Sequence, residues 1–249
     1  MRTCYAIAMF HVCSALLSSP SSIRMQQVAR ASLIAHAPAE YEPFGCARTA
    51  PYHPRMHSLG NVGLTGHMHA TIAPLATKLI DMGAYRGRDM RRDVVAQLPN
   101  ASRVLEVGCG VGMSTRHLVA RYDTVVALDT SPCFVEAARR RVPDASVHIA
   151  NGVDAPSFGQ FDLVVACMLF HEVPSRAHAE LWKAMRDATA PGGCAWIIDI
   201  DTSYRPSAAM EYGEPYLHEY LRDVDRILAP SSQTMAFIPG HVRLWFTAG

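Results

Sequence analysis

The chain lacks several features that would point to particular classes of protein. Its formal net charge is only +1 over 249 residues, so it has no overall basic character of the kind on which nucleic-acid binding depends. None of its seven cysteines forms a CxxC pair, and we expect free thiols in a reducing compartment. The mostly apolar run 4–17 is shorter than the ~20 residues that a membrane-spanning helix needs. We therefore expect no nucleic-acid partner and no membrane span.

A second absence concerns acidic residues near the N-terminus. No aspartate or glutamate precedes Glu40, whereas three arginines and several serines do. This composition is typical of a transit peptide for the mitochondrion or plastid, which is the interpretation we favour. Two alternatives stay open: a secretory signal with small residues at 15–19 near its cleavage site, and an extension that is not cleaved. We expect residues 1–50 to be a disordered targeting segment and linker, and the protein to be intracellular, or cytoplasmic without targeting.

Residues 51–100 are expected to form an N-terminal cap with helices. Apolar side chains recur on one helix face over residues 68–80. A second helix is expected over residues 88–98, and Pro99 would end it. The apolar face of the first helix comprises Met68, Ile72, Leu75, Leu79 and Ile80, and the inward side of the second comprises Met90, Val94, Val95 and Leu98.

From residue 101 to residue 249, short apolar strands alternate with helices. Ser131 and Ser175 are expected to cap two of those helices. Such alternation is typical of an α/β fold with a doubly wound, Rossmann-like parallel sheet. Two further strands are joined by a short turn and must be antiparallel. We predict a seven-stranded sheet of order 3-2-1-4-5-7-6, with the last strand antiparallel, from strands at 103–107, 124–128, 147–150, 161–166, 194–200, 234–237 and 242–246.

The strongest chemical signal is the stretch 104–112, in which a strand runs into the alternating glycines Gly108, Gly110 and Gly112. Glycine lets the backbone turn sharply and lets a ligand approach without a Cβ in the way. Asp129 ends the next strand, where doubly wound folds place an acid that accepts hydrogen bonds from ribose hydroxyls. The pattern predicts a nucleoside-containing ligand. The alternative is that Asp129 only caps the start of the following helix.

A dinucleotide is disfavoured as that ligand. Dinucleotide-binding loops carry glycine or alanine at the sixth position of the motif. Met113 occupies that position here, and its side chain would crowd the packing of helix on strand. A nucleotide-dependent oxidoreductase is therefore the least favoured hypothesis.

Five segments, taken in order, resemble the motifs of class I S-adenosylmethionine-dependent methyltransferases. They are residues 104–112, 125–129, 152–155, 161–165 and 190–193. The turn at 239–241 also resembles the hairpin before that family's reversed last strand, so the resemblance covers residues 88–246. It implies an enzyme that binds S-adenosyl-L-methionine as its cofactor and transfers the methyl group.

The resemblance also implies which residues hold the cofactor. The glycine loop would hold the methionine part, with Glu106 near its amino group, and Asp129 would bind the ribose. Asp154 would reach the adenine amino group, although the inserted Val153 makes Asn151 a rival for this role. The full predicted cofactor site comprises Glu106, Gly108, Cys109, Gly110, Gly112, Asp129, Thr130, Asn151, Asp154 and Cys167.

The best candidates for a catalytic base are His171 and Glu172, just past the fourth strand. Ligands of such sheets lie at the carboxyl ends of the strands, and a base is needed only if the acceptor must lose a proton. The alternative is that His171 orients the cofactor loop. The segment 168–172 departs from the Glu-x-x-Glu-His order of metal-dependent relatives, so we predict no metal.

The predicted function is methyl transfer to a small-molecule acceptor that the sequence does not identify. The alternatives are a relative that binds the cofactor without catalysis and an aminopropyl-transferring relative. Acceptor choice is expected to depend on residues 57–85 and on residues 202–220. The second segment offers a possible aromatic lining, for which packing on the sheet is the alternative: Tyr204, Tyr212, Tyr216 and Tyr220.

We predict that residues 1–45 are dispensable for folding, because they lack helical periodicity and are rich in proline toward their end. The thermal unfolding midpoint of a variant lacking these residues, measured with cofactor present, should equal that of the full chain. A large drop in the midpoint would show that the segment packs on the core.

Overall fold

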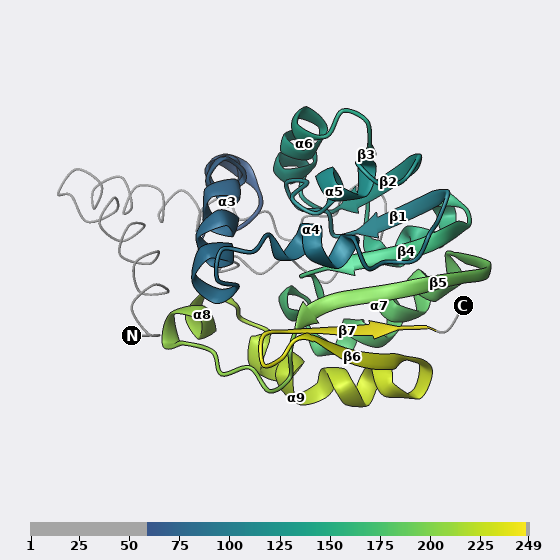
Figure 1. Cartoon of the computed structure of the whole chain (residues 1–249). Helices are drawn as coiled ribbons and strands as arrows, with labels where there is room; N and C mark the ends of the chain where they lie inside the picture. Colours follow the sequence, from purple (N-terminus) through teal and green to yellow (C-terminus); the bar gives the residue numbers. More distant parts are fainter. Residues whose placement is uncertain (1–58, 248–249) are drawn as a thin grey trace.

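The computed structural model describes residues 59–247, which form one mixed sheet with helices on both faces (Figure 1). The sheet order is β3-β2-β1-β4-β5-β7-β6, and β7 runs antiparallel to both β5 and β6. The predicted order and the reversed last strand are confirmed. The strands are β1 (Arg103–Val107), β2 (Thr124–Asp129), β3 (Ser146–Ile149), β4 (Phe161–Cys167), β5 (Thr189–Ile200), β6 (Gln233–Ile238) and β7 (Val242–Phe246).

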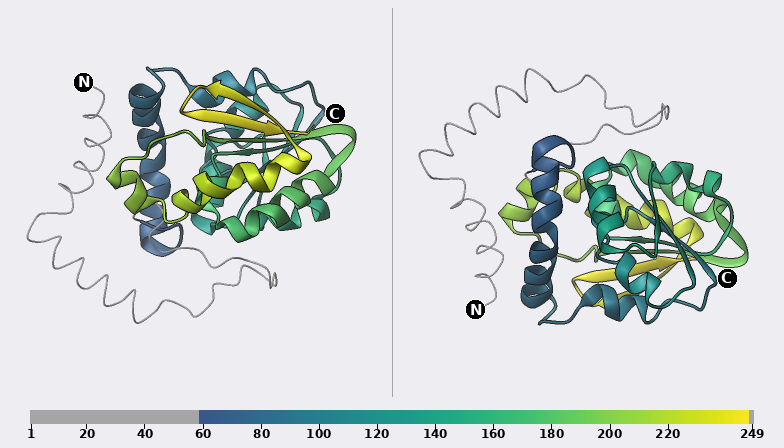
Figure 2. Two further views of the ribbon diagram at one scale, coloured as in Figure 1. Left: turned by 90° about the horizontal axis from the view of Figure 1, so that it is seen from below. Right: turned by 90° about the horizontal axis from the view of Figure 1, so that it is seen from above.

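The helices divide between the two faces of the sheet. Residues of α4 and α5 pack on one face, and those of α7 and α9 pack on the other. Figure 2 shows α3 at one side of the domain, across the ends of the strands. The bounds are α3 (Gly63–Ala84), α4 (Met90–Val95), α5 (Thr115–Val119), α6 (Pro132–Arg141), α7 (Ser175–Asp187), α8 (Ala208–Gly213) and α9 (Leu217–Leu228), with short 3-10 turns η2 (Gly152–Phe158), η3 (Phe170–Glu172) and η4 (Ala229–Ser231).

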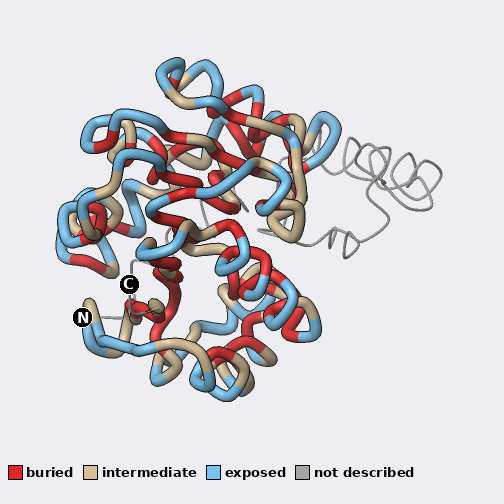
Figure 3. The backbone as a smooth tube through the Cα atoms, turned by 90° about the vertical axis from the view of Figure 1, so that its right-hand side faces the viewer, coloured by how far each residue is buried: buried red, intermediate tan, exposed pale blue. Residues whose placement is uncertain are grey.

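The central strands are buried on both faces, which explains their near-continuous apolar sequences. In β4 only Asp162 is exposed, and in β1 only Arg103 is exposed. The two residues meet at the start of the strands, where the Asp162 carboxylate accepts hydrogen bonds from the backbone N–H groups of Ser102 and Arg103 at 2.9 and 2.8 Å. Figure 3 shows buried residues concentrated in the middle of the fold.

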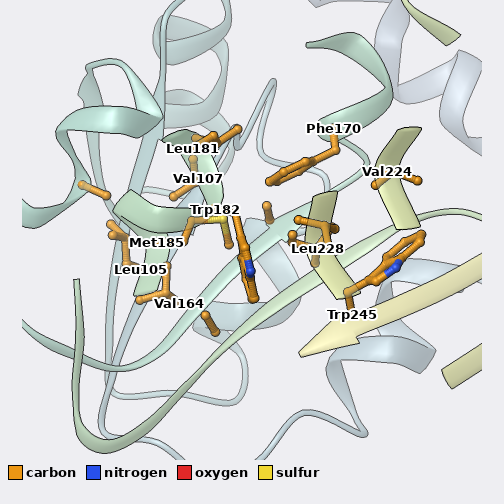
Figure 4. Close-up of a cluster of buried hydrophobic side chains, with 14 of the residues drawn as sticks. Leu105, Val107, Val164, Phe170, Leu181, Trp182, Met185, Val224, Leu228 and Trp245 are labelled. Carbon is orange, nitrogen blue, oxygen red and sulfur yellow. The ribbon is translucent and has the colours of Figure 1, made fainter. Parts of the chain in front are cut away.

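The larger core cluster joins the sheet to α7 and α9 (Figure 4). Trp182 of α7 and Trp245 of β7 are among its largest buried side chains. The Trp182 Nε1–H group donates to the hydroxyl of Ser231 at 2.9 Å, and that of Trp245 donates to Asp225 at 2.9 Å. Both indoles therefore bury their apolar rings while satisfying the polar nitrogen, as buried tryptophans require.

Two local predictions are wrong. Ser175 does not cap α7, because the N-cap residue is Pro174 and no side chain makes a capping bond there. The fifth strand begins earlier than predicted, at Thr189, which pairs with Phe161 before the register shifts. Gly192 and Gly193 therefore lie within an irregular part of the pairing between β4 and β5.

The predicted apolar face of α3 is present but turned outward. Its five side chains are between 37% and 61% exposed. The opposite side of the helix is buried against α6 and the residues before α3 through small side chains, among them Gly66 and Ala70. Periodicity locates a helix correctly but does not state which side of it meets the protein. The predicted inward residues of the second helix, in contrast, are all buried.

No helix within residues 59–247 is long and apolar enough to cross a membrane. The predicted targeting segment lies outside the described residues, as does the whole stretch before Leu59.

Tyr220 belongs to the core and does not form part of an aromatic lining. Its side chain is completely buried on α9, and its hydroxyl donates to the backbone carbonyl of Ile200 at 2.6 Å. This bond fixes α9 to the carboxyl end of β5. Tyr212 is 54% exposed, so the four tyrosines of this region do not share one surface.

We predict that Tyr220→Phe lowers the free energy of unfolding by about 1–3 kcal/mol, because the Ile200 carbonyl loses its buried donor. Urea unfolding measures the change, and Tyr212→Phe makes the same chemical change at an exposed position, where no effect is expected. Equal stability of the two variants would show that the Tyr220 hydroxyl does not anchor α9.

Candidate active site

The sheet brings the predicted site residues to one edge. Strands β1, β2, β4 and β5 are mutually parallel neighbours, so their carboxyl ends meet there. Ligands of open α/β sheets bind outside these ends. The glycine loop follows β1, Asp129 ends β2, His171 follows β4, and Asp199 lies near the end of β5.

The glycine loop has a backbone that only glycine adopts readily. Gly108, Gly110 and Gly112 have φ values of +74°, +53° and +83°, in the left-handed region. A Cβ on Gly108 would lie 2.6 Å from the Leu169 side chain, whereas one on Gly110 would meet nothing within 4 Å. The loop is therefore tightly packed at its first glycine and open at its second.

Glu106 anchors the helix that follows the loop. It is completely buried, and its two carboxylate oxygens accept from the hydroxyls of Ser114 and Thr115, the latter at 2.6 Å. Burial raises the pKa of Glu106, and these two hydrogen bonds act in the opposite direction. The carboxyl thus fixes the turn between β1 and α5, and its expected position near the cofactor's amino group stays a prediction.

Asp129 ties the second strand to the glycine loop. One carboxylate oxygen accepts from the backbone N–H of Gly110 and the other from that of Ser131, both at 2.8 Å. Burial raises the pKa of Asp129 to about 6, although both backbone bonds lower it. A carboxylate offers about four lone-pair sites, so Asp129 keeps capacity to accept from a ligand. It both caps the next turn and faces the site.

The open position at Gly110 and the half-buried carboxylate of Asp129 fit a nucleoside ligand. A Cβ on Gly110 would meet nothing within 4 Å, and the Asp129 carboxylate accepts a hydrogen bond from the Gly110 N–H. A ribose beside Asp129 would find acceptor oxygens already oriented by the loop. A ligand bound there meets a carboxyl group. Ribose hydroxyls, which donate hydrogen bonds, suit this group better than an anionic pyrophosphate does.

The remaining predicted cofactor residues lie around this point. Asn151 caps η2 by accepting from the Val153 N–H at 3.2 Å, and Asp154 is half-buried in the first turn of η2. Thr130 is half-buried beside Asp129. Cys109 and Cys167 are buried thiols, and burial raises the pKa of Cys167 to about 12, so they contribute packing. The choice between Asn151 and Asp154 for adenine stays open.

His171 and Asp199 form a buried pair that the sequence did not reveal. Met168 adopts φ +59° after β4, a conformation uncommon outside glycine, and the chain turns into η3. The Nδ1 atom of His171 lies 2.6 Å from the Asp199 carboxylate, which also accepts from the Phe170 N–H at 2.7 Å. Asp199 thus fixes the ring, whose Nε2 atom lies on the side of Glu172. The sequence signal that could have revealed this pair is Asp199, an acid within the otherwise apolar run 194–200.

The charge state of His171 is set by neighbouring acids. Burial alone would lower the pKa of His171, but Asp199 and then Glu214 and Glu172 raise it to about 9. At neutral pH both ring nitrogens of His171 are therefore protonated and the imidazole is positively charged. Its Nε2 atom lies 4.0 Å from the Glu172 carboxylate. One imidazole nitrogen of His171 and one carboxylate oxygen each of Glu172 and Glu214 lie within 4.8 Å of one another.

Residues 104–193 match the protein family described as "Methyltransferase domain". Over 119 residues, 46% of this chain, the sequence is 36% identical to trans-aconitate 2-methyltransferase of Methylobacterium nodulans, of which 45% is covered. Over 122 residues, 45% of this chain, it is 34% identical to the dTDP-4-amino-2,3,4,6-tetradeoxy-D-glucose N,N-dimethyltransferase of Saccharopolyspora spinosa, of which 49% is covered. The chain thus spans about half the length of these curated relatives.

A solved structure supports the fold independently. The DhpI–SAH complex superposes with a TM-score of 0.53 at 23% identity, covering 74% of this chain and 93% of that one. Residues 104–193 of this chain are thus similar to a methyltransferase domain, and the whole fold is shared with the DhpI–SAH complex. The predicted resemblance to a methyltransferase is thereby confirmed.

We predict that His171 makes stability depend on pH. Its folded pKa is raised from about 6.5 to about 9, so its protonation stabilises the fold fully below pH 6.5 and this contribution is lost as the pH rises through 9. Urea unfolding of the wild type should therefore give a free energy that falls between these pH values, and His171→Gln should remove that fall.

The control is His218→Gln, because His218 is an exposed histidine at 68% and should keep the wild-type dependence. An unchanged pH slope in His171→Gln would contradict the raised pKa.

Proposed function

We propose that the chain is an enzyme that transfers a methyl group from S-adenosylmethionine to a small-molecule acceptor. The observation that carries this proposal is the glycine loop tied to Asp129 at the carboxyl ends of β1 and β2. The family match over residues 104–193 supports the same conclusion. When bound, the cofactor supplies a methyl group already activated on a sulfonium.

Alignment is the main contribution expected from the protein. The loop 108–112 would bind the methionine part through backbone groups, while Asp129 would accept from the ribose hydroxyls and fix the nucleoside. Because the methyl group is activated, holding the acceptor in line with it accounts for most of the rate. A rigid edge of parallel strands suits this task, since the residues that position the ligand come directly from strand ends.

His171 and Glu172 are the proposed acceptor-side groups. Asp199 orients the His171 ring at 2.6 Å, which is how a carboxylate positions a histidine for acid–base work. With its pKa at about 9, His171 is a hydrogen-bond donor at neutral pH and holds the acceptor atom in place. Glu172, half-buried beside it, is then the better acceptor of a proton. Glu214, not foreseen from the sequence, completes this group.

Acceptor choice is proposed to depend on α3 and on the segment after β5. Residues 202–220 connect the end of β5 to α9 and contain α8, so they lie beside the His171 pair. Tyr204 is half-buried and packs against the His241 ring at 5.8 Å. Of the tyrosines in this segment, Tyr204 and Tyr216 keep a possible lining role, since Tyr220 is part of the core.

We predict that Asp129→Ala weakens cofactor binding by about 2–4 kcal/mol, because hydrogen bonds to a charged group contribute about 1.5–3 kcal/mol each without full additivity. That corresponds to roughly 30- to 1000-fold in affinity. Asp129→Asn should cost less, since its carbonyl still accepts one bond. Calorimetric titration with S-adenosylhomocysteine measures both changes.

Asp123→Ala is the matched control, because Asp123 is an exposed acid just before β2. Circular dichroism checks that each variant is folded. If Asp129→Ala binds within threefold of the wild type, the carboxylate acts only as a cap of the loop, and the ribose assignment is lost.

A further inference from the structure

The outward side of α3 carries a continuous apolar stripe. Six side chains along this 22-residue helix are between 37% and 79% exposed. They follow one another at intervals of four, four, three, four and three residues. The stripe comprises Leu64, Met68, Ile72, Leu75, Leu79 and Met82.

This spacing is that of a helix-pairing seam. From Met68 to Met82 the intervals alternate between four and three, which averages 3.5 residues and is the repeat of a coiled coil. At 100° per residue, the stripe lies diametrically opposite the buried side of α3, which includes Gly66, Ala70 and Asp81. One side of the helix is therefore occupied by its own domain, and the other presents a seam to solvent.

We infer that α3 is a dimer interface, on which the stripe of one copy packs against the stripe of a second copy of this chain. The inference goes beyond the proposed methyl transfer and does not depend on it. A stripe that is apolar throughout is complementary to itself, so a two-fold contact removes the stripes of both copies from water at once. A long, exposed apolar patch on a globular domain is a recognised mark of such contacts.

The size of the stripe fits a dimer. From their exposed fractions, the six side chains present roughly 600 Å² on each copy, so pairing would bury roughly 1,200 Å² in total, the lower limit for specific stable interfaces. A concentration-dependent dimer is therefore expected.

Charge gives no reason for the copies to repel each other. Lys78 and Asp81 are the charged residues of α3, and Asp81 is buried on the inner side. Lys78 lies beside the seam and not in it. The helix has no acidic residue in its first turn and no basic residue in its last, so either a parallel or an antiparallel pairing avoids contact between like charges.

The helix is also attached firmly enough to its own domain to act as a rigid surface. The Ser131 hydroxyl donates to the Asn61 carbonyl just before α3. The His69 ring packs edge-on against Phe134 of α6 at 5.0 Å, and its Nδ1 atom lies 3.0 Å from the Gly60 carbonyl. A seam held in this way loses little conformational freedom when it pairs.

Light scattering of the full chain after size exclusion tests the inference at 100 and at 1 micromolar. The wild type should have twice the chain mass of 27.3 kDa at the higher concentration and move toward the single mass on dilution. The double variant Leu75→Glu, Leu79→Glu should have the single mass at both concentrations. Circular dichroism and binding of S-adenosylhomocysteine should match the wild type, which separates loss of pairing from loss of folding.

Met235→Glu is the matched control. It places the same charge on an apolar residue of the edge strand β6, which is 44% exposed, and should leave the dimer intact. A monomeric wild type at 100 micromolar would overturn the inference, as would a dimer that survives the double variant. A dimer lost in Met235→Glu alone would assign the interface to the sheet edge. Dimerisation only after removal of residues 1–45 would show that the chain covers its own stripe.

Discussion

The hydrogen bond from the Gly110 N–H to the Asp129 carboxylate joins the first two strands at the edge where the functional residues gather. It depends on the left-handed backbone of the glycine loop, on the buried Glu106 that fixes the next helix, and on the parallel register of β1 with β2. In turn it orients the carboxylate that we propose to bind the ribose. Without this contact, the glycine loop after β1 would not be joined to the carboxylate at the end of β2 as one proposed binding site.

The proposed acceptor side also depends on a buried carboxylate. Asp199 fixes the ring of His171 from inside the core, across neighbouring strands β4 and β5. Nearby acids hold a proton on that ring at neutral pH. The two proposed halves of the site thus differ: the cofactor half would use backbone geometry and one carboxylate, whereas the acceptor half would use a charged pair. Both halves are rigid because both arise at strand ends.

Strand positions and their order were predictable because buried parallel strands have near-continuous apolar sequences and because a short turn forces antiparallel pairing. The glycine loop and Asp129 were predictable because their chemistry is local. Asp199 was missed, since its partner is 28 residues away and only the folded sheet brings them together. The outward side of α3 was unpredictable for a related reason: periodicity defines an apolar face, but the small residues opposite it made the contact with the domain.

Isothermal titration of the wild-type chain with S-adenosylhomocysteine, set against NAD⁺ under the same conditions, tests the central claim most directly. The open glycine loop with its adjacent carboxylate predicts binding of S-adenosylhomocysteine at one site per chain. Met113 at the sixth position of the loop motif predicts no measurable binding of NAD⁺. Binding of NAD⁺ with no heat from S-adenosylhomocysteine would contradict the account.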